Sequence, residues 1–158
     1  DTVLHFVETD QVTTGAFFAG MCEENMMRIL AEPYVMLGTD ASLRSLTGPL
    51  SQDYPHPRAY GSFPRFLRLA LDGRTVPLGE AVRKMTSLPA GHFRLKNRGV
   101  LAKGMQADVV VFDPARLRDR ADYSAPHRLS EGIDHVIVNG VRTLIDGRLT
   151  GERAGRFL

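Results

Sequence analysis

An acidic residue follows the most apolar short run of the chain. Residues 34–38 read Tyr-Val-Met-Leu-Gly without a polar interruption, and Pro33 stands before them. A short apolar run between Pro and Gly is typical of a strand buried on both faces of a parallel sheet. Asp40 comes two residues later, where parallel α/β folds gather catalytic groups. It is therefore a candidate for proton transfer, although an Asp after a strand can equally serve as a loop cap.

A second group of polar residues lies within residues 56–65. Arg58 has the planar fork of donors that binds a carboxylate through two hydrogen bonds, which Lys does not offer. Exposed Arg is also common on any protein surface, so a solvated cation is the alternative. His56 and Tyr60 flank Arg58. They are weaker candidates for substrate binding, because His56 can simply bond within the loop and Tyr60 can simply pack.

The remaining histidines and the cysteine do not form a metal motif. His5, His92, His127 and His135 lack the spacings at which two histidines of one helix or strand bind zinc. Cys22 is the single cysteine, so the chain has no internal disulfide framework. It precedes two acidic residues and is expected to start a helix. The sequence by itself contains no complete metal site.

These residues need elements that position them, and the first half of the chain predicts mainly helices. Acidic residues at the start and helical spacing of apolar ones predict a helix over residues 23–30. Residues 39–57 form a long polar loop, a length that usually carries function. Further helices are expected over residues 63–71, with Pro64 in the first turn, over residues 78–85, and after the cap-like Ser87.

From residue 98 onward the pattern changes to short β-runs separated by glycine. Residues 98–101 form one such run and residues 107–112 a Val-rich strand. Two β-branched runs flank Asn139-Gly140, the strongest short-range hairpin signal, because a type I′ turn needs positive φ at both central residues. Residues 151–158 are expected to be a tail or an edge strand. The overall class is α/β.

Composition sets limits on function. The chain has 158 residues, 20 Lys and Arg, 18 Asp and Glu, and a net charge of +2, which disfavours a nucleic-acid-binding arm. No apolar run approaches the roughly 20 residues of a membrane span. Residues 1–5 have neither an initiator Met nor the layout of a signal peptide. We therefore expect a cytoplasmic piece of a longer protein, with no nucleic-acid or membrane partner.

Taken together, several segments resemble the carboxyl-terminal part of the N-acyl-D-amino-acid deacylases of the amidohydrolase superfamily. The resemblance runs from about Met21 to the end and rests on residues 22–25, 35–40, 56–65, 85–90, 98–114 and 138–140. It implies a zinc-bearing (β/α)8 barrel with a small β-sandwich built from both chain ends. A barrel needs roughly 250 residues, so this chain is too short to contain one. Residues 1–97 would be the last strand and helices of the barrel, and residues 98–158 the sandwich strands.

The resemblance also implies roles for individual residues. Asp40 matches an Asp beside the metal that takes a proton from the attacking water and returns it to the leaving amine. Arg58 matches the position that holds the substrate carboxylate, and His56 and Tyr60 would lie in the same substrate site. The substrate class is then an N-acyl-D-amino acid. The other zinc ligands would lie on earlier strands, so the isolated chain should be inactive and should self-associate or dock to the missing barrel segments.

Two departures and two alternatives remain. The chain has Gly38-Thr39-Asp40-Ala41 where these deacylases usually have Gly-Ser-Asp-Gly, and its segment from Asp40 to His56 is longer. Both differences fall at the mouth of the site and leave the accepted D-amino acid open. The first alternative hypothesis to a deacylase is a dihydroorotase-like or hydantoinase-like enzyme of the same superfamily. The second alternative hypothesis is a β-rich structural or interaction module without catalytic activity.

Overall fold

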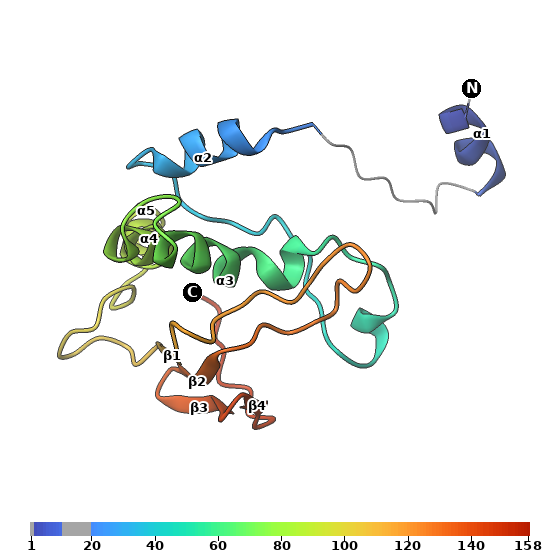
Figure 1. Cartoon of the computed structure of the whole chain (residues 1–158). Helices are drawn as coiled ribbons and strands as arrows, with labels where there is room; N and C mark the ends of the chain where they lie inside the picture. Colours follow the sequence, from blue (N-terminus) through green and yellow to red (C-terminus); the bar gives the residue numbers. More distant parts are fainter. Residues whose placement is uncertain (1, 11–19) are drawn as a thin grey trace.

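The computed structural model describes residues 2–10 and 20–158 (Figure 1). Helix α1 (Thr2–Thr9) buries none of its residues, and Figure 1 draws it apart from the remaining elements. The predicted barrel segment, residues 1–97, includes residues 1 and 11–19, which lie outside the described part of the chain. None of the described helices is long and apolar enough to cross a membrane.

The helices follow the predictions closely, with one shifted start. They are α2 (Glu23–Ala31), α3 (Arg58–Leu71), α4 (Leu78–Met85) and α5 (Ser87–His92). Cys22 is the N-cap of α2, as expected. Thr86, not Ser87, precedes α5. Helix α3 begins at Arg58, five residues before the predicted start.

Helix α3 can begin before Pro64 because a distant residue binds the backbone carbonyl that the proline leaves without its helical donor. Inside a helix, proline has no N–H for the carbonyl four residues back. That carbonyl belongs to Tyr60, and it accepts a hydrogen bond from the Ser130 hydroxyl at 3.5 Å. Upstream, the N–H of Arg58 donates to the His56 imidazole at 3.0 Å, so the first turn is partly capped.

The strand predicted at residues 34–38 was wrong: this segment is assigned no strand. A buried parallel strand needs neighbours on both sides, and the four strands that the structure does assign form an antiparallel sheet elsewhere. Helix α4 holds the segment instead. The Leu37 N–H donates to the Lys84 carbonyl at 3.3 Å, and the Lys84 ammonium donates to the carbonyls of Glu32 and Val35.

The second half forms a four-stranded antiparallel sheet in the order β1-β2-β3-β4. Its strands are β1 (Val109–Phe112), β2 (Ile133–Val138), β3 (Val141–Ile145) and β4 (Arg148–Leu149). The β2–β3 hairpin is confirmed, with φ of 50° at Asn139 and 82° at Gly140. Residues 98–101 are not a strand, whereas residues 151–158 form a tail without secondary structure, one of the two predicted outcomes. Strands β1 and β4 are the edges of the sheet.

The best-packed core lies among the helices. Phe66, Ala70, Val76 and Ala81 are buried together, and Leu30, Leu37 and Met85 pack against them. Leu37 therefore contributes to the core although its segment is not a strand. Figure 1 shows the helices and the sheet as two neighbouring regions. The predicted α/β class is thus confirmed at the level of element content.

Candidate functional site

The two strongest candidates from the sequence meet in space. Nη2 of Arg58 lies 3.0 Å from Oδ2 of Asp40, an ion pair between the loop and the start of α3. The side chain of Asp40 is 91% exposed and that of Arg58 44%, so both can be reached from solvent. The sequence nominated each residue separately, and their direct contact is new.

The backbone at Asp40 is unusual. Its φ is 47°, in the left-handed region that non-glycine residues rarely adopt, although Asp tolerates it better than most. Such conformations cost about 1–3 kcal/mol and cluster at functional sites. Four other non-glycine residues of the described part of the chain share this conformation, namely Arg94, Asn97, Asn139 and Asp146, so at Asp40 it marks a sharp turn of the loop and is not by itself a sign of function.

His56 positions the start of α3. Its Nδ1 accepts the Arg58 N–H, so in the neutral ring Nε2 carries the proton and donates to the Tyr123 hydroxyl at 2.9 Å. Burial lowers the pKa of His56, and the positive charge of Arg58 lowers it further. The neutral imidazole is therefore favoured, and it orders the backbone from which Arg58 projects.

Tyr60 anchors the long loop. Its hydroxyl donates to the Ser45 carbonyl at 3.2 Å, and its ring lies 6.0 Å from that of His127. Tyr54 adds a second tie by donating to the Tyr123 carbonyl at 2.5 Å. Residues 39–57 are thus fixed to α3 and to the segment around residue 123. In this arrangement His56 and Tyr60 support the loop and helix, while Asp40 and Arg58 form the charged contact.

Lys84 is a residue that the sequence analysis missed. Its side chain is 1% exposed, and its ammonium bonds the carbonyls of Glu32 and Val35, the latter at 3.1 Å. Both carbonyls lie in the stretch of chain that leads from the end of α2 to Asp40. The helical spacing could have indicated its burial, because Lys84 lies three residues after Ala81 on α4 and so shares a face with that fully buried residue.

The described residues do not fit a metal ion by themselves. Among them, no group of three or more His, Cys, Asp or Glu side chains is placed to hold one. Asp40 offers a single exposed carboxylate, and its described ion-pair partner is a cation. Any metal at this position would need ligands from elsewhere.

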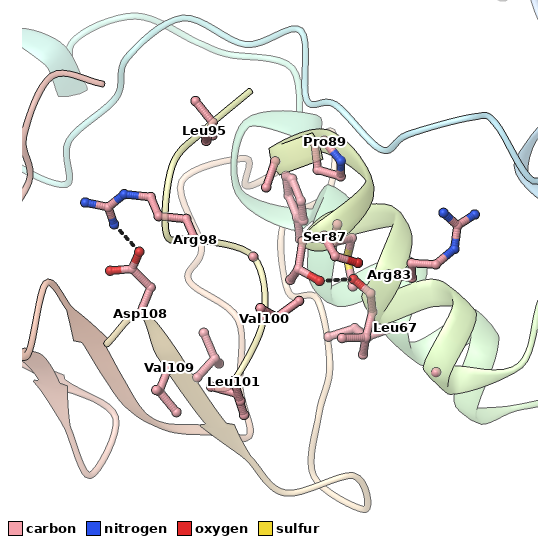
Figure 2. Close-up of a pocket in the computed structure, with 18 of the residues that line it drawn as sticks. Leu67, Arg83, Ser87, Pro89, Leu95, Arg98, Val100, Leu101, Asp108 and Val109 are labelled. Atoms are coloured by element: carbon pink, nitrogen blue, oxygen red, sulfur yellow. Dashed lines mark hydrogen bonds and ion pairs between the residues drawn. The ribbon is translucent and has the colours of Figure 1, made fainter. Parts of the chain in front are cut away.

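A cavity of about 910 Å³ lies away from this ion pair. Helices α3, α4 and α5 line one side, and residues 98–101 and β1 line the other (Figure 2). Most of its walls are apolar, and the pair Arg98–Asp108 lies within the lining. Asp40, His56, Arg58 and Tyr60 are not among the lining residues. We place the candidate site at the ion pair because the groups with suitable chemistry are there.

Comparison with known proteins identifies the family. The model of the amidohydrolase family matches residues 26–144. The chain belongs to this family, and the matched residues include Asp40, Arg58, strands β1 and β2 and all but the last residue of β3.

The curated relatives of the chain are enzymes named as D-aminoacylases or N-acyl-D-amino-acid deacylases. The chain is similar to a D-aminoacylase of Alcaligenes xylosoxydans xylosoxydans, 42% identical over 91% of this chain and 28% of the relative. An N-acyl-D-glutamate deacylase from the same organism is 44% identical over the same shares. The chain thus spans little more than a quarter of the length of the curated relatives it matches.

Solved structures agree with these relatives. The crystal structure of a D-aminoacylase superimposes with a TM-score of 0.77 at 42% identity, covering 86% of this chain and 27% of the other. An N-acyl-D-glutamate deacylase of Bordetella bronchiseptica, solved with zinc and a phosphonate mimic of the tetrahedral intermediate, gives a TM-score of 0.70, covering 82% and 27%.

Proposed function

We propose that this chain is the carboxyl-terminal part of a hydrolase that cleaves the amide bond of N-acyl-D-amino acids, releasing a D-amino acid and a carboxylate. The observation that carries the proposal is the contact between Asp40 and Arg58. It brings a proton-transfer group and a carboxylate-binding group to one exposed place, in a chain whose relatives are D-amino-acid deacylases.

Each residue has a distinct task in this reaction. Amide hydrolysis needs a base for the attacking water and an acid for the poorly leaving nitrogen, and one carboxyl group can do both in turn. Asp40 would take the proton from water and return it to the amine. Arg58 would hold the carboxylate of the amino-acid part by paired hydrogen bonds, which orients the scissile bond. His56 and Tyr60 would contribute to the substrate site and hold its walls.

The complete protein would supply what this chain lacks. Zinc is the proposed cofactor, with Asp40 beside it and the other ligands on segments outside this chain. Residues 1–97 would belong to a (β/α)8 barrel and residues 98–158 to a β-sandwich in a cytoplasmic enzyme. Exposed apolar side chains such as Leu43, Leu101 and Val110 support docking to further segments or self-association.

The test is the kinetics of Arg58→Ala in the full-length protein. Loss of charged hydrogen bonds should raise KM for an N-acyl-D-amino acid about 10- to 100-fold. Arg65→Ala is the matched control, because Arg65 is an exposed residue of the same helix, and its KM should stay at the wild-type value. An unchanged KM in Arg58→Ala would count against the deacylase and favour an enzyme for substrates without a carboxylate.

A further inference from the structure

We propose that the substrate carboxylate displaces Asp40 from Arg58, so that binding of the correct substrate frees the proton-transfer group. The inference rests on the proposed function and adds a regulatory step to the same site. Without ligand, Asp40 and Arg58 hold each other. With ligand, Arg58 turns to the substrate and leaves the carboxylate of Asp40 available to water.

The geometry of the pair supports an exchange. The ion-pair contact joins one Arg58 nitrogen to one Asp40 oxygen at 3.0 Å, whereas a guanidinium can bind a carboxylate through two parallel bonds. Both side chains are well exposed, and ion pairs of this kind are weak. A ligand carboxylate that binds Arg58 through two bonds can therefore replace Asp40 at small cost.

The two partners also differ in how they are held. Arg58 is the first residue of α3, and its backbone is fixed by the bond to His56. Asp40 lies in the loop, in a left-handed conformation. The guanidinium is thus presented from a rigid element to a carboxylate on an irregular one. Exchange needs rotation of side chains only, without movement of the helix.

Binding measurements test the exchange without relying on turnover. The ligand is the ketomethylene isostere of an N-acetyl-D-amino acid, in which CH2 replaces the scissile NH, and its carboxamide serves as the uncharged control. Asp40→Asn in the full-length protein removes the competing charge, and Asn tolerates positive φ. The variant should bind the carboxylate isostere about 2- to 5-fold more tightly, the range that weak ion pairs give. The carboxamide should bind equally to both proteins.

A double-mutant comparison separates competition from general charge repulsion. In the Arg58→Met background, Asp40→Asn should give no gain in affinity, because no guanidinium is left to compete for. A gain that persists without Arg58 overturns the exchange. Asp72→Asn is the matched control, since Asp72 pairs with Arg68 at the other end of α3, and its affinity should match wild type.

Kinetics give a second, independent reading should Asp40→Asn fail to fold. With an N-acyl-D-amino-acid carboxamide as substrate, Asp40 stays paired in wild type, so Arg58→Met should turn this substrate over faster than wild type. Equal or slower turnover overturns the exchange. If wild type neither binds the isostere nor hydrolyses N-acyl-D-amino acids, the proposed function itself fails. Equal isostere affinity of wild type and Asp40→Asn refutes the exchange alone.

Discussion

Replacing Lys84 with Met should destabilise the segment that leads to Asp40. The methionine side chain matches the apolar stem of lysine in length, so the packing around the stem is largely kept. What disappears is the ammonium group that donates to the carbonyls of Glu32 and Val35.

The expected loss of stability depends on which backbone carbonyls keep a hydrogen-bond donor in Lys84→Met. The Glu32 carbonyl keeps a second donor, the Val35 N–H at 3.1 Å. Within residues 2–10 and 20–158, the Val35 carbonyl has no donor besides Lys84. One half-buried acceptor therefore loses its partner, and because water can reach it only in part, the loss costs about 1–3 kcal/mol. Removing a buried charge offsets part of this, so a net loss of about 1–2 kcal/mol is expected.

Urea unfolding measures this loss, with the slope of the unfolding free energy on urea unchanged between variants. Lys103→Met is the control, because Lys103 is exposed in the turn before β1, and it should change stability by less than about 0.5 kcal/mol. A Lys84→Met variant as stable as the Lys103→Met control would refute the assignment of Lys84 as the anchor of this segment.

Two further predictions concern the scaffold. Gly132→Ala should lower the free energy of unfolding by about 2–5 kcal/mol, because φ is +81° and the added Cβ would lie 2.5 Å from the Leu117 nitrogen. Gly140→Ala, at φ +82° with nothing within 4 Å of the added Cβ, should lower it by only about 1–2 kcal/mol. Thermal unfolding of the two variants compares these losses directly. The pKa of His56 is lower in the folded protein than its ordinary value of 6.5. The neutral His56 side chain therefore contributes fully to stability above about pH 6.5, and this contribution is lost as the pH falls through the folded-state pKa. The melting temperature should therefore drop below about pH 6.5, and less so in His56→Gln; an identical pH profile for the variant would show that His56 does not cap α3.

The features that could be predicted from sequence depend on local interactions. Helix α4 repeats apolar residues at helical spacing, and its bounds match the prediction. The hairpin at Asn139-Gly140 follows from backbone conformations that these two residue types accept. Neither depends on distant parts of the chain.

The features that were missed depend on distant contacts. Residues 34–38 have the composition of a buried strand, but an apolar run becomes a strand only where other strands pair with it. The bond between His56 and Tyr123 joins residues 67 positions apart, and no local pattern indicates it. Asp40 and Arg58 were both candidates, yet their ion pair depends on where α3 begins, which Pro64 obscured.

The central claim is that Asp40 transfers the proton in hydrolysis of N-acyl-D-amino acids. Initial rates of the full-length protein on an N-acetyl-D-amino acid and its L-enantiomer, for wild type and Asp40→Asn, test it most directly. The proposal predicts that wild type releases the D-amino acid in preference to the L-form and that kcat falls about 10²- to 10⁴-fold in Asp40→Asn. Wild-type turnover by Asp40→Asn, or hydrolysis of cyclic amides in place of N-acyl-D-amino acids, would contradict it.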